Sequence, residues 1–408
     1  MIAPEFFPTG GGVGSYIIEL IKRLPRNVDV HVVTLKRRFG KRHIGETGND
    51  DIDSIVKRPI EIHYVSTAKE SFYYNLVFQL ACLKNIPSLA KECKFDILHS
   101  HLSHMPDILL QLSNMVKVPT VATVHTTIRM QKEAISNSGL GFAGLEWSEK
   151  NTLLLYPLIS LLQKKYAKRV SRFIAVSNMT KERISSDLNI ENDKISVVYN
   201  GVDTVLFHPL NGVETDRRYS RPTIVYVGRM MRGKGLHLLV ESMPSILRSF
   251  PEARFMFAGE GEIQFYEEMM RREGISEKSF SFLGYVGYHE RLKILQEATV
   301  FVNPSLFENC SMSILEAMST GATVVANCVG GNPELIRTEE NGILVPSCDS
   351  KALAQSIISV LGDENLSKEI GKKARTTVVE RFSSERMARD TYNIYESVLS
   401  DKARALVL

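Results

Sequence analysis

Short β-rich segments alternate with helical segments along almost the whole chain, and this alternation limits the possible folds more than any other feature. In chain order, the predicted strands are residues 28–35, 60–66, 95–101, 120–125, 172–177, 195–199, 223–228, 253–259, 280–285, 299–304, 322–328 and 342–346. Several are nearly continuous apolar runs, which is typical of strands buried on both faces. Helical segments such as 15–24 and 179–188 lie between strands, so the order predicts βαβ units and parallel sheets.

The chain is long enough for two domains, because 408 residues exceed the usual size of a single core. The alternation stops between Phe207 and Pro222, where a polar segment with proline and glycine shows no apolar period. We interpret this segment as an interdomain linker. The sequence therefore predicts an N-terminal Rossmann-like domain over 1–206 and a C-terminal one over 207–383. A helix at about 384–408 is expected to pack back on the first domain.

Charge and cysteine content exclude some functions. The formal net charge is only +4, with 50 basic and 46 acidic residues, so nothing indicates a nucleic-acid partner. The five cysteines are scattered and form no CxxC pair. They predict neither a metal site nor a disulfide framework, and they suit a reducing compartment.

The N-terminus and the longest apolar run predict a cytoplasmic protein. Residues 1–5 lack the basic and apolar regions of a signal peptide. The apolar run 153–162 is interrupted by Pro157 and is shorter than the roughly 20 residues that cross a membrane. Residues 1–4 look like the end of a strand, so the true start of the chain could lie a few residues upstream.

A glycine cluster at 10–14 precedes the helical segment 15–24. Glycine amides at a helix N-terminus can hold an anion, although a flexible turn would have the same sequence. NAD binding is not favoured, because Ser15 replaces the third glycine of GxGxxG. The next strand also ends in Lys36 and Arg37 where that fold has an acidic residue.

A second glycine-rich loop, residues 227–235, follows the first strand of the predicted C-terminal domain and contains Arg229 and Lys234. An Arg fork and a Lys point charge at the carboxyl edge of a parallel sheet suit a diphosphate, although a solvated basic loop is the alternative. The loop is not a Walker motif, because Gly235 stands where Ser or Thr would be needed.

The segment after strand 299–304 carries the strongest signal. Ser311 or Ser313 can cap a helix that ends near Gly321, which places Glu308 in the loop and Glu316 within the helix. The helix start between them can hold a phosphate, and the two carboxylates can accept hydrogen bonds from sugar hydroxyls. Glu316 lies among apolar residues, where a carboxylate usually has a partner.

Glu308 and Glu316 resemble the E-x7-E motif of family-4 retaining glycosyltransferases, which have the GT-B fold. Other segments resemble this family in order and spacing, namely 3–16, 95–101, 120–125, 175–178, 199–203 (YNGVD), 228–235, 326–334 and 341–346. The resemblance covers nearly the whole chain. It implies two Rossmann-like α/β domains facing a cleft, and transfer of a sugar from a nucleotide-sugar donor with retention of configuration.

The resemblance also implies a role for each site residue. Arg229 and Lys234 would hold the donor diphosphate. Glu308 would bind sugar hydroxyls, Glu316 the ribose hydroxyls, and His125 would lie near the transferred sugar. The other donor-binding residues would be Gly12, Gly228, Asn309, Cys310, Ser311, Met312 and Ser313, with amides around Gly12 and 310–313 completing the phosphate cradle.

One position departs from the family pattern, because Ser311 stands where the family commonly has glycine, and serine can still cap the helix.

His99, His101 and His104 cluster in the sequence, but the family generally needs no metal. We therefore expect neither a metal nor a cofactor.

Two other functions share this fold: a sugar-nucleotide epimerase, and a non-catalytic subunit of a glycosyltransferase complex. A non-catalytic subunit should tolerate loss of Arg229, Lys234, Glu308 and Glu316, and all four are present. The sequence therefore favours a hexosyl- or related glycosyltransferase of polysaccharide or glycolipid synthesis. It does not identify the acceptor, which could be a glycan, a lipid or a small molecule.

Basic residues near an apolar run suggest peripheral contact with an anionic membrane at its inner face. They are Lys36, Arg37, Arg38, Lys41 and Arg42 after the strand at 28–35, and Lys164, Lys165, Lys168 and Arg169 after the run 153–162. Each basic residue near such a surface adds about 1 kcal/mol. The alternative is that the apolar run packs in the domain core and the charges are solvated.

Overall fold

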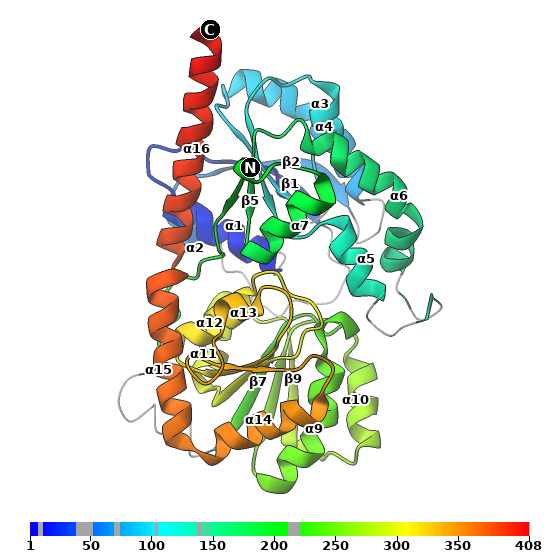
Figure 1. Ribbon diagram of the computed structural model, residues 1–408, viewed down its shortest axis with the longest axis vertical. Coiled ribbons are helices and arrows are strands. Elements are labelled where there is room, and N and C mark those ends of the chain that lie inside the picture. Colours follow the sequence, from blue (N-terminus) through cyan, green and yellow to red (C-terminus); the bar gives the residue numbers. More distant parts are fainter. Residues whose placement is uncertain are drawn as a thin grey trace. The chain divides into compact units, whose positions relative to one another are not determined.

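The computed structural model describes residues 1–6, 11–37, 52–68, 74–102, 105–136, 141–142, 145, 147–210 and 221–407. The chain divides into two compact units. Of the described residues, those up to Tyr199 and those from Glu385 onward belong to the first unit, and Asn200–Ser384 belong to the second. Each unit has parallel strands packed against helices (Figure 1).

The strands of the first unit run parallel, as the sequence predicts. They are β1 (His31–Arg37), β2 (Glu61–Ala68), β3 (Leu98–Leu102), β4 (Thr120–Val124), β5 (Arg172–Ala175) and β6 (Ile195–Val197). β1 pairs with β2, and β3 to β6 pair in chain order. Ile2 makes parallel bridges to Val33 of β1 and Ser100 of β3, so it joins the two groups of strands.

Helices cover both faces of this sheet. They are α1 (Gly12–Arg23), α2 (Ile52–Val56), α3 (Tyr74–Glu92), α4 (Ile108–Ser113), α5 (Ile128–Ser136), α6 (Trp147–Ala167), α7 (Asn178–Leu188) and α16 (Ser384–Val407). Alternate strand residues serve opposite faces. Val32 and Val121 pack in one core with α1 and α16, whereas Ala122 packs in another with α6 and α7. This explains the continuous apolar runs of these strands.

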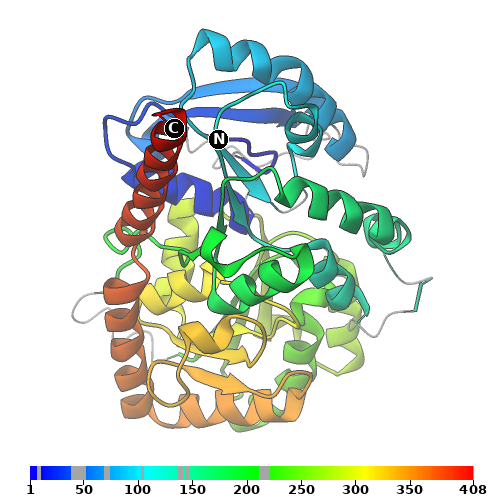
Figure 2. The same ribbon diagram turned by 45° about the horizontal axis from the view of Figure 1, so that its top comes forward.

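The C-terminal helix α16 belongs to the core of the first unit. Figures 1 and 2 show it running beside α1. Met387, Ala388 and Val398 are buried in the same cluster as the apolar face of α1. The hydroxyl of Tyr395 lies 2.5 Å from Nδ1 of His99 on β3, so a polar contact adds to the apolar packing.

The second unit holds one parallel sheet in the order β12-β11-β10-β7-β8-β9. Its strands are β7 (Thr223–Val227), β8 (Arg254–Ala258), β9 (Phe280–Gly284), β10 (Val300–Asn303), β11 (Thr323–Asn327) and β12 (Ile343–Val345). The chain builds outward from β7 to β9 and then returns to the other side of β7 with β10. The strand order therefore reverses between β7 and β10, where open α/β sheets bind ligands at their carboxyl ends.

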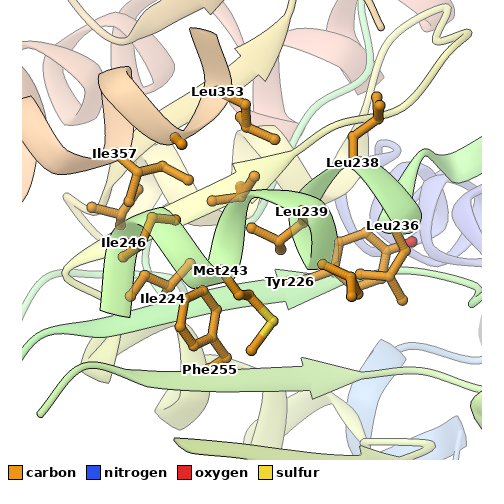
Figure 3. Close-up of a cluster of buried hydrophobic side chains, with 14 of the residues drawn as sticks. Ile224, Tyr226, Leu236, Leu238, Leu239, Met243, Ile246, Phe255, Leu353 and Ile357 are labelled. Carbon is orange, nitrogen blue, oxygen red and sulfur yellow. The ribbon is translucent and has the colours of Figure 1, made fainter. Parts of the chain in front are cut away.

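The helices of this unit are α9 (Leu236–Ser249), α10 (Ile263–Arg272), α11 (Tyr288–Glu297), α12 (Met312–Ser319), α13 (Asn332–Leu335), α14 (Ser350–Gly362) and α15 (Glu364–Arg381). α9, α10 and α14 lie on one side of the sheet, and α11 and α12 lie on the other (Figure 1). Leu239 and Met243 of α9 pack against Ile224 and Phe255 of the sheet (Figure 3). Figure 3 also shows Ile357 of α14 in this cluster.

Every predicted strand is present, with each end within three residues of the expected position. The predicted helix starts near Ser15, Met179, Ser311 and Ser384 are also confirmed. Residues 211–220 of the predicted linker lie outside the described part of the chain.

The second unit begins at Asn200, whereas the predicted boundary lay after residue 206. Arg375 of α15 explains the difference, because its guanidinium donates to the carbonyl oxygens of Thr204 at 2.8 Å and Phe207 at 2.7 Å. Gly201 also lies so close to Ser383 that a Cβ atom there would be 2.5 Å from its carbonyl oxygen. These contacts bind residues 200–207 to α15 and to Ser383, which follows it.

Gly235 occupies a position in the second unit where a single added methyl group would clash with the backbone. Its φ is +68°, and a Cβ atom would lie 1.8 Å from the carbonyl oxygen of Pro304. Gly235→Ala should lower the Tm of the protein by about 5 °C or more, because it adds left-handed strain and a backbone clash. Gly233→Ala is the matched control, since its Cβ would have no neighbour within 4 Å. Equal Tm values for the two variants in thermal unfolding would contradict the close packing.

Candidate functional site

Two loops meet at the carboxyl ends of the neighbouring strands β7 and β10. Residues 228–235 follow β7, and residues 304–311 follow β10. Gly235 lies against Pro304, and the amide of Leu306 donates to the carbonyl oxygen of Gly233 at 3.1 Å. These contacts hold the two loops together at the point where the strand order reverses.

The first part of the β7 loop is fixed by the loop that follows β8. The amide of Gly228 donates to Ala258 at 2.9 Å, and the amide of Met230 donates to Glu260 at 2.7 Å. Gly259 has a φ of +140°, and a Cβ atom there would be 1.9 Å from the carbonyl oxygen of Gly228. Arg229 lies between these bonds with an exposed side chain. The backbone is therefore ordered while the guanidinium faces solvent, as an anion-binding residue requires.

Lys234 and Glu308, which the sequence assigned to different parts of the donor, form an ion pair. Lys234 Nζ lies 2.7 Å from Glu308 Oε1. The hydroxyl of Ser305 donates to the same oxygen at 2.9 Å. The Lys234 and Glu308 side chains are 30% and 12% exposed, so this partly buried contact is screened less than a surface pair.

The N-terminus of α12 is built as the sequence predicts. Ser311 is its N-cap and accepts a hydrogen bond from the amide of Ile314 at 3.4 Å. Asn303 at the end of β10 donates to the Ser311 hydroxyl at 3.3 Å. Met312 and Ser313 form the first turn, whose amides have no acceptor within the helix. This turn can receive an anion, since the positive end of the helix dipole lies there.

The segment between Glu308 and α12 is held from two sides. The side-chain amide of Asn200 donates to the carbonyl oxygen of Cys310 at 2.7 Å, and the amide of Gly331 donates to that of Glu308 at 2.9 Å. Asn309 is partly buried. Burial raises the pKa of the Cys310 thiol to about 12, so the thiol is neutral and serves packing.

Glu316 is buried on α12, and its partner is Arg291 of α11. Arg291 Nη2 lies 2.9 Å from Glu316 Oε1, and the two side chains are 12% and 4% exposed. The guanidinium also lies 5.1 Å from the ring centre of Tyr288. Burial raises the pKa of Glu316, and the charge of Arg291 opposes that shift. The expected partner of this carboxylate therefore exists, and the sequence did not identify it.

His125 belongs to the first unit and directly follows β4. Its ring lies 4.9 Å from the ring of Tyr16 on α1, in an edge-to-face arrangement, and 6.0 Å from the ring of His101. Burial lowers the pKa of His125 to about 4, and the charge of Glu5 opposes that shift. The imidazole is therefore neutral near pH 7 and can both donate and accept a hydrogen bond.

His101, at the carboxyl end of β3, is a further candidate in the same group. It is 1% exposed, and neither of its ring nitrogens has a hydrogen-bond partner among the described residues. A buried polar group without a partner usually indicates a water molecule or ligand. His99 is different, because Tyr395 and Thr123 occupy both of its nitrogens. His104 lies outside the described residues.

The glycine cluster of the first unit leads into α1. Gly12 is the first helical residue and Gly11 is the N-cap, and a Cβ atom on either would have no neighbour within 4 Å. The helix start is therefore open to an anion, although Gly10 lies outside the described residues.

Sequence reasoning found the residues that carry a motif and missed the residues that hold them. Lys234 and Glu308 meet, and Gly228 and Arg229 share the loop that carries Lys234. Arg291 and Ser305 were missed because no short motif includes them. A carboxylate buried among apolar residues needs a cationic partner, and this expectation for Glu316 was the one feature of the sequence that could have led to Arg291.

Comparison with known proteins agrees with this architecture. Residues 10–206 match the model of Glycosyltransferase Family 4, and residues 221–363 match the model of Glycosyl transferases group 1. An uncharacterized glycosyltransferase of Methanocaldococcus jannaschii is 28% identical over 326 residues, covering 76% of this chain and 77% of that protein.

Two further proteins resemble most of the chain. The UDP-Gal:alpha-D-GlcNAc-diphosphoundecaprenol alpha-1,3-galactosyltransferase of Escherichia coli is 26% identical, over 86% of this chain and 90% of its own length. The crystal structure of Anabaena HepE in complex with UDP-glucose superimposes with a TM-score of 0.72 at 18% identity, covering 96% of this chain and 98% of that one. With both halves matched, the chain belongs to the family-4 type of glycosyltransferases and has the GT-B fold.

Proposed function

We propose that the second unit binds the nucleoside-diphosphate part of a nucleotide-sugar donor, and that transfer to an acceptor hydroxyl retains the anomeric configuration. The chain is a glycosyltransferase that uses a nucleotide-sugar donor. The observation that carries the assignment of the site is the Lys234–Glu308 ion pair beside the N-terminus of α12. It places a cation, a carboxylate and free amides at the point where the strand order reverses.

The diphosphate is assigned to Arg229, Lys234 and the first turn of α12. The Arg229 side chain is exposed on an ordered loop, and Lys234 is held in place by Glu308. Negative charge grows on the diphosphate as the glycosidic bond breaks. Cations already in position stabilise that state more than the ground state, which lowers the barrier.

The two carboxylates are assigned to different hydroxyls of the donor. Ser305 and Lys234 orient Glu308, which would bind the sugar. Arg291 orients Glu316, which would accept from the ribose. Holding both ends of the donor positions the bond that breaks, and positioning supplies much of the rate in such reactions.

The first unit would supply His125 and the amides around Gly12 to the sugar and phosphate. His125 is neutral near pH 7, so it can donate a hydrogen bond without adding charge. We assign no protein nucleophile, and the leaving phosphate would take the proton of the acceptor hydroxyl. No metal is needed in this scheme, because Arg229 and Lys234 provide the positive charge.

The α6 helix supports a further proposal, contact with an anionic membrane. Trp147, Leu154, Leu158 and Leu161 are 70%, 66%, 56% and 53% exposed. Their spacing of seven, four and three residues places them on one face. Lys165 continues that face, Lys168 follows directly after the helix, and both are exposed. An apolar stripe that ends in lysines suits a bilayer interface.

The alternative that the apolar run 153–162 packs in the domain core therefore holds only in part, because only some of its side chains are buried. Ile159 and Leu162 pack on the cluster of α7 and β5, while the leucines of the opposite face lie exposed.

Among the basic residues after β1, Arg38, Lys41 and Arg42 lie outside the described residues. In the part of the chain that is described, no helix has the length and apolar character needed to span a bilayer. The E. coli relative acts on a sugar linked to diphosphoundecaprenol, which is compatible with a lipid acceptor here.

A screen of UDP-, GDP- and ADP-sugars identifies the donor, with UDP-sugars tested first because the E. coli relative uses UDP-Gal. With that donor, Lys234→Ala should reduce turnover by about 100- to 1,000-fold, with a smaller change in donor affinity. Arg229→Lys should also reduce turnover, because a point charge does not replace a guanidinium fork.

Lys278→Ala is the control for this pair, since Lys278 is an exposed lysine that precedes β9 at the amino end of the sheet. Initial rates and donor binding are measured for Lys234→Ala, Arg229→Lys and Lys278→Ala. Turnover within a few-fold of wild type for both site variants would show that the loop is only a solvated basic turn.

The two carboxylates are distinguished by binding of the free nucleoside diphosphate, measured by calorimetry. Glu316→Gln should weaken nucleotide binding, whereas Glu308→Gln should leave it nearly unchanged and reduce transfer. Glutamine keeps the shape of each side chain and leaves an amide beside the cation, which limits the loss of stability. Loss of nucleotide binding in Glu308→Gln alone would reverse the assignment.

Membrane contact is tested by co-sedimentation with phosphatidylglycerol and phosphatidylcholine vesicles. Wild type should bind the anionic vesicles more strongly, and Leu158→Asp should lose most of that binding. Val205→Asp is the control, because Val205 is 75% exposed and belongs to the second unit rather than to α6. Negligible binding of wild type to both kinds of vesicle would exclude the proposal.

A further inference from the structure

A second group of side chains with metal-binding chemistry lies in the first unit, and the proposed transfer reaction does not use it. His31, Glu61, His63 and Cys93 each offer one donor atom, and these four atoms all lie within 4.8 Å of one another. His31 begins β1, Glu61 and His63 lie at the start of β2, and Cys93 follows α3. The group is therefore at the amino ends of the strands, whereas His101 and His125 lie at the carboxyl ends.

Strand pairing explains how residues so distant in sequence meet. β1 and β2 are parallel, with His31 opposite Glu61 and Val33 opposite His63. β2 lies at the edge of its sheet, and α3 packs against it. Cys93 directly follows α3 and therefore lies beside the two strands. Since about thirty residues separate the three segments, no linear motif marks the site.

The distances are close to those inside a tetrahedral metal site. His31 Nδ1 lies 3.0 Å from His63 Nε2 and 3.3 Å from Glu61 Oε2. His63 Nε2 lies 3.8 Å from the same carboxylate oxygen. Two donors bound to one zinc ion at 2.0–2.3 Å lie about 3.3–3.8 Å apart in tetrahedral geometry. Small rotations of these side chains are sufficient to surround an ion.

Partial burial separates this group from an ordinary surface cluster. The side chains of His31 and His63 are only 16% and 21% exposed, and Cys93 is partly buried. The His31 ring also lies 5.1 Å from the ring of Phe95, which restricts its orientation. Glu61 is 68% exposed, so it can swing toward an ion or away from it.

We propose that His31, His63, Cys93 and Glu61 form a structural zinc site that links β1, β2 and the end of α3. Two imidazoles, a thiolate and a carboxylate suit zinc and exclude magnesium and calcium, which prefer oxygen ligands. All four positions are taken by protein, as in structural rather than catalytic sites. The ion would stabilise the edge strand β2, and the thiol proton of Cys93 would leave to solvent on binding.

The test uses the full chain after treatment with a chelator. Zinc titrated by calorimetry, together with metal analysis after gel filtration, should give one ion per chain. Cys93→Ser and His63→Ala should each weaken zinc binding by at least about 100-fold, since loss of even an outer partner costs 10- to 100-fold. Cys348→Ser and His289→Ala are the controls, because both residues are exposed elsewhere in the chain.

Two other measurements keep the proposal falsifiable if a variant folds poorly. Cobalt added to wild type should give a thiolate-to-metal charge-transfer band that is absent in Cys93→Ser and present in Cys348→Ser. Zinc at about 100 times its Kd should raise the Tm of wild type by roughly 5 °C and leave Cys93→Ser unchanged. Absence of zinc binding in wild type, or equal binding in Cys93→Ser, would overturn the proposal. Neither outcome bears on the transfer reaction, since the readouts do not involve activity.

Discussion

The close contact between Gly235 and Pro304 is the constraint on which the proposed donor site of the second unit depends. β7 and β10 are neighbours in the sheet, but neighbouring strands alone do not determine how the following loops run. Because Gly235 has no side chain, the start of α9 can lie against the end of β10. This brings Lys234 to Glu308 across 74 residues of sequence, and it leaves the first turn of α12 beside them.

The two carboxylates of the site differ in environment, and the difference suits different tasks. Glu308 is in a loop and shares one oxygen between Lys234 and Ser305, so its interactions can be exchanged when a ligand arrives. Glu316 is buried within a helix and paired with Arg291, so it is more firmly fixed. A fixed carboxylate suits recognition of the nucleoside, and an exchangeable one suits the end of the donor that changes during transfer.

Much of the fold could be predicted because strands buried on both faces leave a clear apolar signal, as in Thr120–Val124 and Thr323–Asn327. The cap at Ser311 was also predictable, since capping depends on local sequence. Arg291 and the His31–Cys93 group were not, because they depend on packing between distant segments. The sequence left open whether the leucines of α6 are exposed or packed in the core, for a related reason. An apolar run shows that a helix has leucines, but not which of them the neighbouring elements cover.

The central claim is that Arg229, Lys234 and the start of α12 recognise the second phosphate of the donor nucleotide. The most direct measurement compares the affinity of wild type for a nucleoside diphosphate and for the monophosphate of the same base. The account predicts that the diphosphate binds at least about 10-fold more tightly, since charge-assisted hydrogen bonds contribute about 1.5–3 kcal/mol each. It also predicts that Lys234→Ala removes most of this preference. Equal affinity of wild type for the two nucleotides would contradict the account, because the loop would then contribute nothing to donor recognition.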